Sequence, residues 1–145
     1  MPLAAQVKIT QGNNQITVDI DGKPYTTFFY GPDVAKPYLY PLRSMTGTSV
    51  SRGFPMEKIE GEMTDHQHQR SMWLAHDSVN GYDYWNNEFS YDRPKLGHMF
   101  VQKITKAEGG AKQGEIDILP GHAPYLGQLG TGVLRFTTEG KEVQL

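Results

Sequence analysis

Alternation of apolar and polar residues is the pattern that most restricts the fold of this chain. In residues 15–20, Ile16, Val18 and Ile20 would face a core while the residues between them face out. Similar strands are expected at 7–10, 25–30, 98–105, 116–119 and 132–138, with a last one after residues 139–141. No 15-residue window shows a helical period. The sequence therefore predicts an all-β fold, an antiparallel β-sandwich or part of one.

Turn residues and prolines separate these strands. Residues 12–14, Asp21-Gly22 and residues 108–110 are typical of tight turns. Between residues 31 and 55, four prolines limit regular pairing to short or edge strands, because each lacks a backbone donor.

Length and composition exclude several classes of protein. A chain of 145 residues fits a single domain with a real core. Its net charge of −2 has mixed signs and no basic run, so neither nucleic acid nor an anionic membrane is an expected partner. It contains no cysteine, which excludes disulfides, thiolate metal sites and a thiol nucleophile. No apolar stretch approaches the roughly 20 residues of a membrane helix.

Reactive side chains concentrate between Thr64 and Trp85, a stretch that holds three of the five histidines and both tryptophans. If residues 64–69 are extended, His66 and His68 share one face and Asp65 lies on the other. That spacing suits a pair of metal ligands or a polar wall against a ligand. The alternative is that these polar side chains only hydrogen-bond the loops beneath them.

Two further groups are candidates for ligand contact. Arg43 follows Tyr38 and Tyr40, and it would either bind a carboxylate or sugar hydroxyls or pack over rings. The rings of Tyr82, Tyr84, Trp85 and Phe89 would either stack on sugar faces or form core.

Four motifs together resemble the PmoA-like family of bacterial proteins over about residues 6–115. They are K-P-Y-L-Y-P-L-R at 36–43, S-R-G-F-P at 51–55, D-H-Q-H-Q-R-S-M-W-L-A-H at 65–76 and V-N-G-Y-D-Y-W at 79–85. Where that family usually has D-H-P-H-H-R, this chain has Gln67 and Gln69. The resemblance implies a secreted or periplasmic β-sandwich of the galactose-mutarotase-like kind, associated with carbohydrate processing. Such proteins are about twice as long, so this chain would hold half of the supersandwich.

A second resemblance begins near Gly114. The run G-E-I-D-I-L-P-G-H-A-P-Y-L-G-Q-L-G-T-G-V-L-R-F at 114–136 is similar to the N-terminal β-sandwich of the ATP synthase epsilon subunit. Two resemblances in one chain favour a chimera, with residues 1–113 joined to grafted strands at 114–145. A natural fusion and convergence on a turn motif are the alternatives. Leftover sheet edges would favour a homo-oligomer, expected as a dimer.

Three functions follow from these patterns. The first is a β-sandwich without established activity, whose histidine-rich face is associated with carbohydrate. The second is a sugar-active enzyme, an epimerase, lyase or hydrolase, that needs no cofactor. Its catalytic residues would be Asp65, His66, His68 and His76, and its substrate-binding residues Arg43, Arg70, Asn80 and Trp85. No metal is expected; a metal variant would use His66, His68 and a third ligand from His76, His98 or a carboxylate. The third is docking to a rotor as an epsilon-like subunit.

Overall fold

The fold is described from a computed structural model, which describes residues 6–123 and 132–137. These residues contain ten strands and no helix, which confirms the all-β prediction. The strands are β1 (Val7–Gln11), β2 (Gln15–Ile20), β3 (Lys23–Phe29), β4 (Tyr38–Tyr40), β5 (Met72–Trp73), β6 (Ser78–Val79), β7 (Tyr82–Asp83), β8 (His98–Glu108), β9 (Gln113–Ala123) and β10 (Gly132–Thr137).

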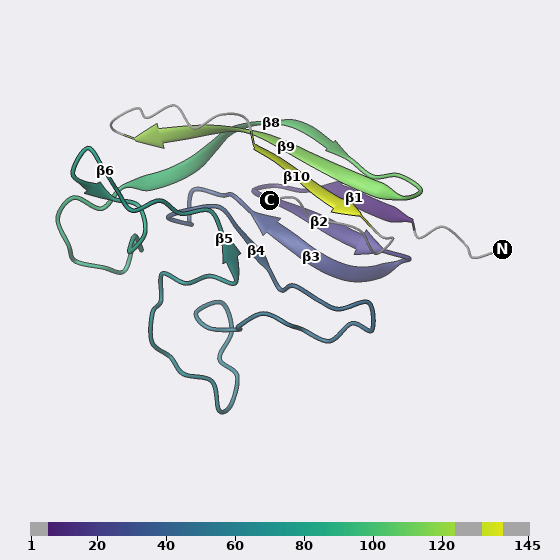
Figure 1. The fold of residues 1–145 in the computed structure, drawn as a ribbon, viewed down its shortest axis with the longest axis horizontal. Helices are drawn as coiled ribbons and strands as arrows, with labels where there is room; N and C mark the ends of the chain where they lie inside the picture. Colours follow the sequence, from purple (N-terminus) through teal and green to yellow (C-terminus); the bar gives the residue numbers. More distant parts are fainter. Residues whose placement is uncertain (1–5, 124–131, 138–145) are drawn as a thin grey trace.

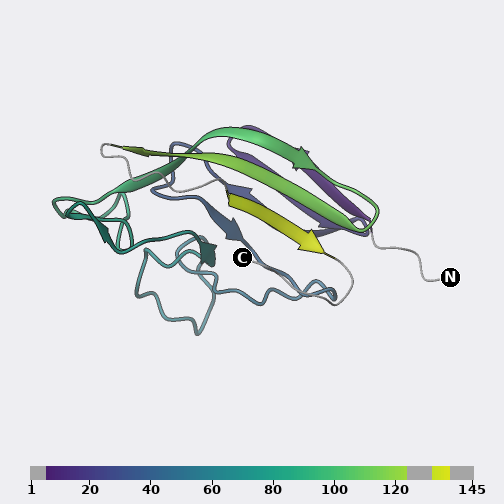
Figure 2. The same ribbon diagram turned by 45° about the horizontal axis from the view of Figure 1, so that its top comes forward.

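The strands form two main antiparallel sheets and one small hairpin (Figure 1). The five-stranded sheet has the order β1-β2-β3-β4-β5, and the three-stranded sheet has the order β10-β9-β8. Strands β6 and β7 pair with each other as a separate two-stranded hairpin. In a view turned by 45°, the long β8–β9 ribbon lies over the strands of the five-stranded sheet (Figure 2).

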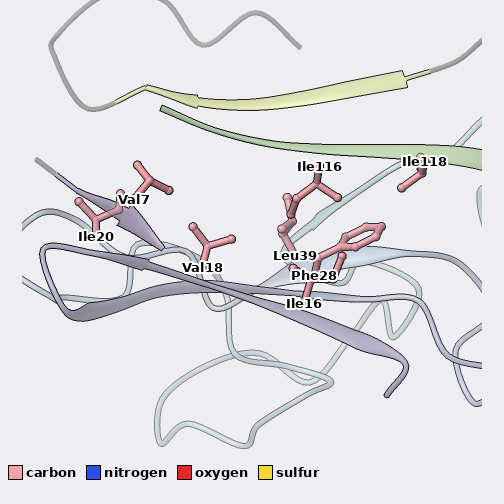
Figure 3. Close-up of a cluster of buried hydrophobic side chains, with 8 residues drawn as sticks. All are labelled: Val7, Ile16, Val18, Ile20, Phe28, Leu39, Ile116 and Ile118. Atoms are coloured by element: carbon pink, nitrogen blue, oxygen red, sulfur yellow. The ribbon is translucent and has the colours of Figure 1, made fainter. Parts of the chain in front are cut away.

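The core lies between the two main sheets. Figure 3 shows Ile116 and Ile118 of β9 pointing toward the side chains of the five-stranded sheet. The members of the core are Val7, Ile16, Val18, Ile20, Phe28, Leu39, Ile116 and Ile118. Each such side chain contributes roughly 1.5–3 kcal/mol when it is fully buried. The residues expected to face a core from β2 do so, and the two layers make a sandwich.

The turn between β8 and β9 ties one end of the two layers together. The backbone N–H of Val7 donates to the carbonyl oxygen of Gly110 at 2.9 Å. A Cβ at Gly109 would come within 2.3 Å of the Val7 carbonyl oxygen, so only glycine fits there. The glycine pair that predicts a turn therefore also makes a layer contact.

Strands β8 and β9 extend well beyond the expected ranges 98–105 and 116–119. Both are 11 residues long, and their pairing shifts register between Val101 and Lys103 and again between Ile104 and Lys106. These bulges interrupt the alternation, which is why the pattern alone gave shorter strands. The strand expected after residue 138 lies outside the described residues.

A long irregular segment, residues 41–71, connects β4 to β5 and loops out beside the sheets (Figure 1). Its local order comes from hydrogen bonds such as that from the Val50 N–H to the Leu42 carbonyl at 2.8 Å. The Glu62 carboxylate accepts hydrogen bonds from the backbone of Gly53 and Phe54 at 3.0–3.1 Å. The segment ends in the histidine motif. No helix long and apolar enough to cross a membrane occurs in the described residues.

Candidate functional site

The histidine motif forms a turn, so the condition that residues 64–69 are extended is not met. His66 has a φ of 49°, and the Gln69 N–H donates to the His66 carbonyl at 2.9 Å. The two rings nevertheless meet, with their centroids 5.7 Å apart in an edge-to-face arrangement. The turn brings His66 and His68 together. In an extended strand, alternation of side chains would have placed them on one face instead.

The Asp65 carboxylate links His66 to Arg52. One carboxylate oxygen accepts from Nδ1 of His66 at 2.7 Å, and the other accepts from the Arg52 guanidinium at 2.9 Å. Arg52 also donates to the backbone carbonyls of Met63 and Asp65. The hydrogen bond from His66, followed by that from Arg52, lowers the pKa of Asp65. An ionised Asp65 holds the proton on Nδ1, so Nε2 of His66 is the free base nitrogen.

The two histidines have different environments. The His66 side chain is 55% exposed, and Nδ1 makes its one side-chain hydrogen bond to a described residue. His68 is 6% exposed, and its Nδ1 lies 3.4 Å from the Tyr91 hydroxyl. Burial lowers the pKa of His68, and the charges of Lys36 and His66 add to that effect. His68 is therefore neutral near pH 7, and His66 is the accessible imidazole.

Contacts from the loop at 84–93 hold this turn in place. The Arg70 guanidinium donates to both carboxylate oxygens of Glu88, at 2.5 and 2.7 Å, and lies 5.2 Å from the centre of the Tyr38 ring. The Ser90 hydroxyl donates to the Gln67 side chain at 2.9 Å. Arg70, expected to bind substrate, is thus committed to an ion pair within the protein.

A fully buried lysine, Lys36, lies behind the turn. Its Nζ donates to Asn87 Oδ1 at 2.7 Å and to the Trp85 carbonyl at 3.0 Å. The Asn87 amide donates in turn to the Gly97 carbonyl at 2.7 Å. Burial lowers the pKa of Lys36 to about 8, against an opposing effect of the Glu88 charge. Sequence reasoning missed Lys36, Asn87 and Glu88; the one local signal was a lysine between Ala35 and Pro37 beside an apolar strand.

The ring cluster is divided between core and surface. Tyr84 is buried and occupies the space that a Cβ on Gly97 would need. Trp85 is 42% exposed and packs edge-to-face on Trp73 with centroids 5.8 Å apart. Phe89 is 52% exposed and lies against His98, 4.7 Å between centroids. Trp85 and Phe89 therefore offer apolar faces to a ligand.

Three of the predicted site residues lie apart from Asp65, His66 and His68. Asn80 has a φ of 54° and, with Gly81 at 80°, makes the two-residue turn between β6 and β7. Arg43 forms an isolated bridge with Ser49 in the long segment. His76 is exposed between β5 and β6. In the described part of the chain, no hydrogen bond, ion pair or ring contact joins any of the three to Asp65, His66 or His68.

The metal variant lacks its ligand set in the described residues. Within 6–123 and 132–137, no three His, Asp or Glu side chains gather closely enough to hold a metal ion. His98, one of the candidate third ligands, packs on Phe89. Acid/base chemistry is what the Asp65–His66 pair can perform on its own.

Two comparisons with known proteins found a match. A model of a family of unknown function, DUF6807, matches residues 15–128. The ATP synthase epsilon chain of Bdellovibrio bacteriovorus is 44% identical over 59 residues, which is 41% of this chain and 42% of that protein. This chain thus aligns with about two fifths of the length of that relative. No solved structure matches.

These matches bear on the expected junction between residues 113 and 114. The family match contains every motif of the PmoA-like resemblance, although the comparisons do not show that family name. It also continues past the junction to residue 128. The family and epsilon matches together exceed the length of the chain, so they overlap. The family match therefore does not end where the motifs had placed a joint.

Proposed function

This chain belongs to the DUF6807 family, whose function is unknown, and we propose that its Asp65–His66 pair is the acid/base centre of a sugar-active site. The observation that carries the proposal is the hydrogen bond of 2.7 Å between Asp65 Oδ2 and His66 Nδ1, on a ring that is 55% exposed. A carboxylate at Nδ1 orients an imidazole and fixes its tautomer, which leaves Nε2 free to act as the base. Arg52 fixes that carboxylate from its other side.

The chemistry is proton transfer at Nε2 of His66. Nε2 takes a proton from a sugar hydroxyl or carbon, and Asp65 stabilises the imidazolium that forms. Arg52 has a positioning role, because it contacts Asp65 and does not contact the imidazole. His68 stays neutral beside the pair and fills one wall of the site.

A sugar is the ligand class that suits the exposed rings of the loop that contacts the histidine turn. Trp85 and Phe89 lie on the loop whose Glu88 and Ser90 bind that turn, and they supply apolar ring faces of the kind that stack on sugar rings. The PmoA-like resemblance, carried by motifs that include Asp65 and His66, also implies a link to carbohydrate. The reaction would be an epimerisation, an elimination or a hydrolysis, all of which need a positioned acid or base.

Deuterium exchange tests the proposal without assuming a product. A panel of mono- and oligosaccharides is incubated with the protein in D₂O, and loss of carbon-bound proton signals or appearance of new anomeric signals is followed by NMR. His66→Asn is the appropriate variant, because asparagine tolerates the positive φ at this position better than alanine. We expect it to lower turnover at least about 100-fold, the scale of general acid–base catalysis.

Two controls decide how the result is interpreted. His76→Asn removes an exposed histidine outside the site and should leave turnover unchanged, and circular dichroism confirms that each variant is folded. Turnover that survives His66→Asn would refute the acid/base role. Sugar binding without turnover by the unmodified protein would refute the enzyme and leave a carbohydrate-binding module.

A second candidate function is docking to the ATP synthase rotor. The match to an ATP synthase epsilon chain, 44% identical over 59 residues, favours it. The test is binding of the purified chain to the gamma subunit from Bdellovibrio bacteriovorus, with that organism's epsilon chain as the positive control. Binding at micromolar concentration or tighter would support this role. No binding under conditions in which the epsilon chain binds would eliminate it.

A further inference from the structure

We infer that the ligand of this site is an acidic sugar, a uronate, whose carboxylate is bound by Arg93. The inference rests on the proposed function, since it assigns the class of sugar that meets His66. It comes from the described side chains that connect His66 to Arg93 and from their charges.

Arg93 is the last member of a continuous row of planar groups that begins at His66. The His66 and His68 ring centroids are 5.7 Å apart, and those of His68 and Tyr91 are 6.3 Å apart. The Arg93 guanidinium lies 5.1 Å from the centre of the Tyr91 ring. The guanidinium is therefore linked to the acid/base histidine by direct side-chain contacts.

Arg93 has no ion-pair partner among the described residues, unlike the other two arginines of the site. Arg52 is paired with Asp65, and Arg70 with Glu88. Arg93 is exposed, and its neighbour Asp92 does not come within 4.0 Å of its nitrogens. The site thus presents one uncommitted guanidinium.

Stacking on Tyr91 prepares this guanidinium for a carboxylate. A ring beneath the plane limits the motion of the group while its N–H edge stays open. A planar fork of donors matches the two oxygens of a carboxylate, and such charge-assisted pairs are stronger than neutral hydrogen bonds. A neutral sugar would leave that fork unused.

The separation of the two groups suits a chain of uronate units. Two side chains, His68 and Tyr91, lie between His66 and Arg93 in the row of contacts. An oligouronate can place the carboxylate of one unit at Arg93 and another unit at His66. Arg93 is therefore assigned to binding, and His66 to proton transfer.

The contribution of the carboxylate to binding is measured with pairs of ligands that differ only in that group. Titration calorimetry at low salt compares trimers of galacturonate, glucuronate and mannuronate with their methyl esters, which keep the sugar and lose the charge. We expect at least one acid to bind about three- to tenfold more tightly than its ester. Arg93→Gln should abolish that preference. Lys95→Asn removes a neighbouring exposed cation at a φ of 62° and should preserve it.

The outcomes separate this inference from the proposed function. Equal affinity for acids and esters, equal effects of Arg93→Gln and Lys95→Asn, or no binding of any trimer would each overturn the uronate assignment. An Arg93-dependent preference without deuterium exchange would support uronate binding and refute the acid/base role. Deuterium exchange on neutral sugars that is lost in His66→Asn and unchanged in Arg93→Gln would support the acid/base role and refute the uronate assignment.

Discussion

The guanidinium of Arg70 and the carboxylate of Glu88 form a two-bond ion pair that fixes the histidine turn to the loop carrying Tyr91. The Glu88 side chain is 5% exposed and that of Arg70 18%, so the pair is largely removed from water. Two charges in such a place stabilise the fold only while both are present. The position of His66 relative to Tyr91 and Arg93 thus depends on this pair.

Removing one partner of this pair should be costly. Glu88→Gln leaves the Arg70 charge without a counter-charge, and we expect a loss of about 3–5 kcal/mol in the free energy of unfolding. Urea denaturation near neutral pH measures it. The double variant Arg70→Met with Glu88→Leu removes both charges and should cost much less. A single variant that loses under about 1 kcal/mol would mean that water compensates Arg70.

The first three strands could be predicted because their signals are local. Alternation in residues 15–20 and the Asp21-Gly22 turn each lie within a few residues, and the structure places β2 and β3 accordingly. The site could be predicted only in part. Asp65, His66 and His68 do meet, although through a turn with a positive φ at His66 that alternation does not encode.

The residues that sequence reasoning missed are those defined by distant partners. Lys36 and Asn87 are 51 positions apart and have no shared motif, yet they form the buried hydrogen bond behind the turn. A lysine is ordinarily expected at the surface. The burial of Lys36 becomes visible only in the structure, where its Nζ donates to the Trp85 carbonyl and to Asn87.

Lys36 should make stability depend on pH in alkaline solution. Its pKa falls from 10.5 to about 8 in the folded protein. Between these values the unfolded chain holds a proton that the folded chain has lost, so raising the pH favours folding. At 1.36 kcal/mol per pKa unit, the gain in the free energy of unfolding across this range is about 3 kcal/mol. Urea denaturation at about pH 7.5 and about pH 10.5 should show it for the native protein relative to Lys36→Met. Parallel stability curves for the two proteins would contradict it.

A single core should join the two segments that the motifs separate. Ile116 is fully buried against the five-stranded sheet, so Ile116→Ala should lower the free energy of unfolding by about 2–5 kcal/mol. Leu119→Ala, at a residue that is 44% exposed, should cost far less. Circular dichroism and tryptophan fluorescence should report one coincident transition. Two separate transitions would indicate that residues 1–113 fold independently.

His68 should weaken the fold in acid. Burial lowers its pKa below the ordinary 6.5, so below that value the unfolded chain binds a proton that the folded chain does not. Stability should therefore fall as the pH drops from about 6.5 toward the folded pKa, and the change should be smaller in His68→Gln. Unfolding midpoints in urea across that range measure the difference. Equal acid sensitivity in both proteins would assign the effect to other groups.

Asn80 provides the sharpest distinction between a turn residue and a ligand contact. Its φ of 54° and that of Gly81, 80°, are what a two-residue hairpin of the mirror-image type requires. Asn80→Gly keeps that backbone conformation and removes the amide, so stability should change by less than about 0.5 kcal/mol and sugar binding should persist. Asn80→Val imposes a β-branched residue at a positive φ and should cost about 1–3 kcal/mol. Titration calorimetry with the uronate trimers reads out binding in both variants. If Asn80→Gly is stable and no longer binds, the amide contacts ligand, and the expectation that Asn80 holds substrate regains its place beside Arg93.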